Sequence, residues 1–179
     1  KIVRNAVNTP KIDAEALPFM DLARKMGYLG RQILGQVPSL VEVTLYNGAE
    51  QFSSNVRLGV FAGVLQEDEP LSFPTAAYRA KKAGMVYEER TPIEGKLGLS
   101  AYKNAMTLDV IADHSRISIR GRILPEGTQE VSRISRLKDL QLITQYDVSF
   151  KLQGYLVFVE IDQDTPGTLA AEFLRLLRS

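Results

Sequence analysis

The stretch Ala105-Met-Thr-Leu-Asp-Val-Ile-Ala-Asp-His-Ser-Arg-Ile-Ser-Ile-Arg-Gly-Arg-Ile-Leu124 predicts a β-hairpin. Its strands span residues 105–112 and 116–124, with His114-Ser115 near the turn. Successive side chains of a strand point to opposite faces of a sheet. In the second strand one face therefore carries Ile117, Ile119 and Ile123, and the other carries Arg116, Ser118, Arg120 and Arg122. The hairpin predicts a sheet with one apolar face and one face that bears arginines.

Helices and further strands surround this hairpin. The spacing of apolar residues predicts helices over 18–36, 55–67 and 75–83, the last ending at Gly84. Strands are predicted over 41–46, 85–90, 131–137, 140–144 and 148–152, and the last two are short. Arg133 and Arg136 fall on opposite faces of their strand. The succession predicts an α+β fold, with a largely antiparallel sheet and helices packed on one face.

Two glycines interrupt the first predicted helix. Gly27 and Gly30 each cost about 1 kcal/mol relative to alanine inside a helix. We expect them to allow close packing against another backbone.

Residues 155–178 predict a second, smaller unit. Residues 155–161 have the composition of a strand buried on both faces. Asp162-Gln-Asp164 breaks this run, Thr165 can cap a helix, and Pro166 suits its first position. No strand follows this βα unit in the sequence. We therefore expect either that the chain is a fragment, or that preceding residues or a partner complete the unit.

Composition excludes several classes of protein. The chain has 179 residues and a net charge of +1, whereas a general nucleic-acid binder needs a clear basic excess. It has no cysteine, which excludes disulfides and thiolate metal sites and fits a cytoplasmic protein. No apolar run is long enough to span a membrane.

The sequence predicts no catalytic residue and no metal site. His114 is the sole histidine, and a histidine beside a hairpin turn is usually exposed to solvent. Gly27, Gly30 and Gly35 lie on a helix rather than after a strand, so they do not form a dinucleotide-binding loop.

Two groups of residues are candidates for ligand binding. Arginines on neighbouring strands can converge on a phosphate or carboxylate: Arg116, Arg120, Arg122, Arg133 and Arg136. The alternative is a solvated sheet face without a function. The second candidate is the loop with Asp162, Asp164 and Gly167, where a helix N-terminus favours an anion and the acidic side chains favour an amino group. Its alternative is a capped turn.

The order of several motifs resembles the regulatory region of D-3-phosphoglycerate dehydrogenases. The motifs are Asn5-Ala-Val-Asn-Thr-Pro10, Leu22-Ala-Arg-Lys-Met-Gly-Tyr-Leu29, the segment from Ser72 to Glu88, and Asp164-Thr-Pro-Gly167. The last of these resembles the first loop of an ACT domain, a small ferredoxin-like effector-binding unit.

This resemblance implies an allosteric substrate-binding (intervening) domain over residues 1–150 and a truncated ACT domain over 151–179. The chain is then no enzyme by itself, because the catalytic and NAD-binding domains belong to the parent enzyme of serine biosynthesis. The implied partners are a small anionic metabolite such as phosphoglycerate or phosphate, further copies of the chain, and the parent's catalytic domains. Arg133 matches a basic residue of the family's anion site, and Arg136 and Lys138 lie close by.

The sequence also departs from this family. Serine-sensitive ACT domains carry His-x-Asn where this chain has Asp162 and Asp164, so serine feedback through the loop is not expected. One alternative is a structural module for subunit association without a small ligand. Another is the regulatory region of an iron–sulfur L-serine dehydratase, although its Ser-Ser-Ser-His motif is not found.

Overall fold

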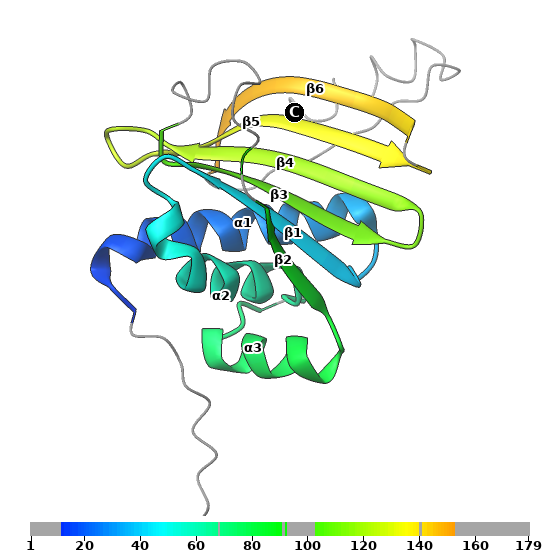
Figure 1. Ribbon diagram of the computed structural model, residues 1–179, viewed down its shortest axis with the longest axis horizontal. Coiled ribbons are helices and arrows are strands. Elements are labelled where there is room, and N and C mark those ends of the chain that lie inside the picture. The colour runs from blue at the N-terminus through cyan, green and yellow to red at the C-terminus, as the bar shows by residue number, and fades with distance from the viewer. Residues whose placement is uncertain (1–11, 68, 91, 93–102, 140, 153–179) are drawn as a thin grey trace, which may run out of the picture.

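The computed structural model describes residues 12–67, 69–90, 92, 103–139 and 141–152. These residues form a sheet that is covered by helices on one face (Figure 1). The helical elements are η1 (Ala14–Ala16), α1 (Leu17–Leu34), η2 (Glu50–Phe52), α2 (Ser53–Val64) and α3 (Phe73–Lys82). The strands are β1 (Leu40–Tyr46), β2 (Val86–Arg90), β3 (Ala105–Ala112), β4 (Ser115–Ile123), β5 (Gln129–Lys138) and β6 (Gln141–Lys151). The predicted α+β fold is confirmed.

The strands follow the order β2-β1-β3-β4-β5-β6. Every neighbouring pair is antiparallel except β1 and β2, which are parallel. Parallel neighbours need a long crossover, because the chain must return to the same end of the sheet. Helices α2 and α3 supply this crossover, and they lie on the same side of the sheet as α1 (Figure 1).

The core lies between the sheet and helices α1 and α2. Alternate positions of the central strands point toward the helices, as in the opposed pairs Val43 with Leu108 and Leu108 with Ile119. From α1, Leu22 and Met26 are fully buried against them. Each such side chain contributes about 1.5–3 kcal/mol through burial. The apolar face of the predicted hairpin therefore forms part of the sheet side of the core.

Glycines allow α1 and α2 to approach closely. A Cβ atom on Gly63 of α2 would collide with the carbonyl oxygen of Arg24 on α1. A Cβ on Gly27 would lie 3.0 Å from the carbonyl oxygen of Val60, so its predicted packing against a backbone is confirmed. Gly30 differs, because its nearest neighbour is the side chain of Val110 on β3, at 2.9 Å from an added Cβ.

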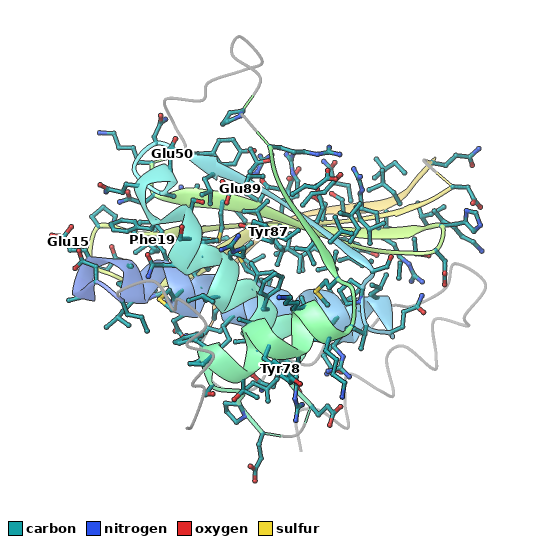
Figure 2. All side chains as sticks on the ribbon, turned by 60° about the horizontal axis from the view of Figure 1, so that its bottom comes forward. Glu15, Phe19, Glu50, Tyr78, Tyr87 and Glu89 are labelled. Atoms are coloured by element: carbon teal, nitrogen blue, oxygen red, sulfur yellow. The ribbon has the colours of Figure 1, made fainter. Side chains whose placement is uncertain are left out.

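Strand β2 is attached to α2 by the side chains that it turns toward the helices. The Tyr87 ring lies edge-on to Phe61, with ring centroids 5.7 Å apart, and the Ser53 hydroxyl donates a hydrogen bond to Glu89. Figure 2 shows Tyr87 and Glu89 together on this side of β2. Burial, assisted by the charge of Glu89, raises the pKa of Tyr87. The hydroxyl therefore stays neutral, and these contacts fix the edge strand to the helix layer.

The C-terminal part of the described chain differs from the prediction. Residues 141–151 form one strand, β6, where two short strands were expected. Its pairing with β5 is irregular at two places, and its middle is polar and mostly exposed, which obscured the alternation. The predicted βα unit over 155–178 lies outside the described residues, as do Asp162, Asp164 and Gly167.

Candidate functional site

The sheet face opposite the helices is polar and charged. It consists of the alternate positions that the core does not use, as the strand pairing shows. Its charged residues come from all six strands of the sheet: Glu42, Glu88, Arg90, Asp109, Arg116, Arg120, Arg122, Glu130, Arg133, Asp147 and Lys151. Basic and acidic groups are nearly equal in number. We call this surface the polar sheet face.

Four of the predicted arginines lie on the polar sheet face. Arg116, Arg120 and Arg122 follow one another along β4 at alternate positions. Arg133 of β5 stands directly opposite Arg120. A bulge at Ser132, which has no partner between the Arg120–Arg133 and Gly121–Val131 pairs, sets this register. The strand pairing thus brings the four side chains onto one surface.

The other two basic residues predicted for the anion site, Arg136 and Lys138, require a correction, although the opposite faces predicted for Arg133 and Arg136 are confirmed. Arg136 stands opposite Ile117, and Lys138 stands opposite Ser115, so both point to the helix side of the sheet. The cause is the two-residue period of a strand, since Arg136 follows Arg133 by an odd number of positions. Arg136 and Lys138 cannot share a site with the arginines of the polar sheet face.

Carboxylates that the sequence analysis did not select hold most of these arginines. Arg122 Nη2 lies 3.1 Å from Glu130 Oε1, and Arg133 Nε lies 2.7 Å from Asp147 Oδ1. Alternation along each strand predicts that these carboxylates lie on the face away from the core. The arginine that each carboxylate contacts could not be predicted, because contacts between strands depend on the register.

The most buried charge of this face is Glu42. Its side chain is only 4% exposed, and one oxygen lies 2.8 Å from Arg116 Nη2. Its other oxygen pairs with Arg90 of β2. Arg90 and Arg116 therefore reach the same carboxylate from strands on either side of β1, which ties β2, β1 and β4 together.

Asp109 of β3 stands directly opposite Glu42. Burial raises the pKa of Asp109, and the charge of Glu42 acts in the same direction. A hydrogen bond with Ser118 and the charges of Arg116 and Arg90 only partly offset these effects. Burial and the facing carboxylate therefore favour the protonated form of Asp109.

The Arg120–Arg133 pair has a different character. Directly opposed residues have Cβ atoms about 5 Å apart, so these two side chains leave the sheet as neighbours, although Arg120 is held toward β3 by Thr107 and Arg133 toward β6 by Asp147. Arg120 Nε donates a long hydrogen bond, 3.4 Å, to the Thr107 hydroxyl. Arg133 is partly exposed, and its partner Asp147 is mostly exposed. Planar guanidinium groups bind carboxylates and phosphates through paired hydrogen bonds. This part of the face has the chemistry of an oxyanion site.

The described residues show no other chemical centre of comparable character. His114 is exposed at the β3–β4 turn as predicted, with Nδ1 at 3.3 Å from Asp139 Oδ1. In these parts of the chain, no three His, Cys, Asp or Glu side chains are grouped so that they can hold a metal ion. Nor does any described helix have the length and apolar character needed to cross a membrane.

Comparison with known proteins adds no family. No protein-family model matches the chain, and no curated protein matches it significantly.

Proposed function

We propose that this chain is a regulatory module that binds a small anionic metabolite on its polar sheet face. The binding residues are Arg120 and Arg133, with Arg122 alongside. The parent protein, by the resemblance of the motifs, is an NAD-dependent D-3-phosphoglycerate dehydrogenase of serine biosynthesis in the cytoplasm. Phosphoglycerate or phosphate is then the ligand, and NAD binds elsewhere in the parent enzyme.

The observation that carries this proposal is the direct opposition of Arg120 and Arg133 across β4 and β5. Like charges placed opposite each other destabilise a sheet. An anion that draws the two guanidinium groups together offsets that repulsion and accepts charge-assisted hydrogen bonds from both. Arg122 lies two residues from Arg120 on the same face, and Glu130 partly offsets its charge.

Two of the motifs that carry the resemblance fall on regular elements of the fold. The Leu22–Leu29 motif lies within α1, and the Ser72–Glu88 segment covers α3 and most of β2. Ser72 caps α3 by accepting a hydrogen bond from the Thr75 backbone N–H, so this segment begins where the motif begins.

A thermal-shift titration tests the anion site. The chain is titrated with 3-phosphoglycerate, inorganic phosphate and L-serine, with sodium chloride at matched ionic strength as the reference. A ligand that binds only the folded state stabilises it by about 2.7 kcal/mol at a hundredfold excess over Kd. We expect stabilisation by phosphoglycerate or phosphate, and none by serine.

Two variants locate the binding. Arg133→Glu is expected to abolish the ligand shift while the protein stays folded, because Arg133 lies at the partly exposed edge of the face. Lys82→Glu makes the same charge change on the exposed end of α3, away from the sheet, and serves as the control. An undiminished shift in Arg133→Glu rejects this site.

A second candidate function is subunit association without a small ligand. Strand β6 is the last strand of the described sheet, and its Leu142, Ile143 and Tyr146 side chains are exposed. An exposed edge with apolar side chains invites pairing with another chain. Sedimentation equilibrium tests this, because the candidate predicts a dimer that Ile143→Lys dissociates. A monomer over a wide concentration range counts against it.

A further inference from the structure

We propose that Asp147 is a built-in competitor for the anion site, which a bound anion must displace from Arg133. This inference rests on the proposed function, and it concerns how the affinity of that site is set.

The geometry of the Arg133–Asp147 pair supports this role. The two residues stand opposite each other on β5 and β6, and Oδ1 of Asp147 lies 2.7 Å from Nε of Arg133. A carboxylate at this position occupies the hydrogen-bonding site that an anion would take. The negative charge of Asp147 also repels any anion that approaches the Arg120–Arg133 pair.

Exposure distinguishes this carboxylate from the others that hold arginines on the same face. Its side chain is 67% exposed, whereas the side chains of Glu130 and Glu42 are 10% and 4% exposed. Solvent-exposed ion pairs are weak, whereas the loss of one partner from a buried pair is costly. Of these three carboxylates, Asp147 is therefore the one that a ligand can displace most easily.

Strand β6 is suited to such an exchange. It has only β5 as a described neighbour, and its pairing with β5 is irregular between Val131 and Arg133 and again between Arg136 and Leu137. Asp147 lies in the regular segment between these irregularities. Displacement of its carboxylate therefore removes a side-chain link between β6 and β5. Anion binding is expected to loosen the middle of β6 while it stabilises β4 and β5.

The substitution Asp147→Asn removes the competing charge and keeps the shape of the side chain. Because an exposed ion pair contributes about 0.2–1 kcal/mol, its removal should tighten anion binding by about 1.4-fold to fivefold. Loss of the repulsion between Asp147 and the incoming anion acts in the same direction. Asp139→Asn is the matched control, because Asp139 lies in the β5–β6 turn and is exposed beside His114.

The test is calorimetric titration of four proteins with inorganic phosphate at constant ionic strength: wild type, Asp147→Asn, Asp139→Asn and Arg133→Gln. We expect tighter binding in Asp147→Asn, unchanged binding in Asp139→Asn, and greatly weakened binding in Arg133→Gln. Hydrogen exchange with and without phosphate gives the second readout, and we expect faster exchange in the middle of β6 in wild type and Asp139→Asn but not in the other two variants.

The outcomes separate the competitor role from the anion site. Unchanged or weaker binding in Asp147→Asn, together with loss of binding in Arg133→Gln, overturns the competitor role and keeps the site. Equal tightening in Asp147→Asn and Asp139→Asn also overturns it, because net charge alone then explains the effect. If phosphate binds none of the four proteins, the site itself is rejected and the competitor role with it.

Discussion

Glu42 of β1 and Asp109 of β3 stand directly opposite each other on the polar sheet face, yet their environments differ. Glu42 is held by two guanidinium groups, from Arg90 and Arg116. Burial and the nearby charge of Glu42 raise the pKa of Asp109. The two facing carboxyl groups thus lie in different surroundings, and each gives a prediction.

Asp109→Asn is expected to stabilise the protein at neutral pH. Because its pKa is raised, the folded state holds the proton of Asp109 more tightly than the unfolded chain does, where the pKa is near 3.8. The stability that this proton provides is complete at pH values below 3.8 and declines as the pH rises toward the folded-state pKa. Urea unfolding at pH 7 should show a gain for the variant, and at pH 3 the gain should disappear. An equal loss of stability at both pH values contradicts the prediction.

Asp21 on α1 should behave in the opposite way. Burial alone would raise the pKa of Asp21, but hydrogen bonds from Lys25, Arg24 and Gln129 outweigh it and hold the pKa below its usual value. Its contribution to stability is therefore present above pH 3.8 and is lost as the pH falls through the folded-state pKa. Asp21→Asn should unfold at lower urea concentration than wild type at pH 7, with the difference shrinking in acid. A difference that does not depend on pH means that the charge of Asp21 is unimportant.

Glu42→Gln should be strongly destabilising. The change leaves Arg90 and Arg116 without the buried carboxylate that they share. Breaking a buried ion pair by removing one partner costs about 3–5 kcal/mol, and the partial exposure of both arginines places this variant near the lower value. Glu88→Gln on the exposed edge strand is the control, expected within about 0.5 kcal/mol of wild type in denaturant unfolding. Similar stability of both variants would show that Glu42 contributes no more than a surface residue.

Gly63→Ala should push α1 away from α2 and so lower the stability of the protein. The added methyl group would meet the backbone of α1 at Arg24 and Tyr28, and a backbone can move only with its whole helix. Overpacking of this kind costs about 1–3 kcal/mol, and it opposes the roughly 1 kcal/mol that alanine gains over glycine in a helix. Gly27→Ala has more room, since its nearest contact is at 3.0 Å, and should be the milder of the two in urea unfolding. The reverse order of stability argues against this packing.

Much of the fold could be predicted because its signals are local. The alternation in residues 105–124 gave both strands of the hairpin and the face on which each arginine lies, and the apolar spacing gave all three α-helices. The prediction divided β6 into two short strands, because Gln145 and Asp147 interrupt its apolar residues. Both of these polar residues face the polar side of the sheet.

The site was harder to predict, because its contacts join distant parts of the chain. The pairing of Arg116 with Glu42 spans 74 residues, and no local pattern indicates which carboxylate meets which arginine. Arg136 and Lys138 were grouped with Arg133 for their closeness in sequence, although alternation along the strand already predicts the opposite face for Arg136, and the register places both on the helix side.

The position of β1 inside the sheet affects the order in which the protein can be assembled. Strands β3 to β6 are neighbours both in the sheet and along the chain, so their hairpins need only short loops to close. Strand β1 must instead wait for partners made much later, as the 61-residue span of the Tyr46–Thr107 hydrogen bond illustrates. Non-local pairing slows folding, because the entropy of loop closure is lost before the contacts form. During synthesis the valine-bearing strand β1 therefore emerges before both of its partners, β2 and β3, and its exposure until they follow favours aggregation.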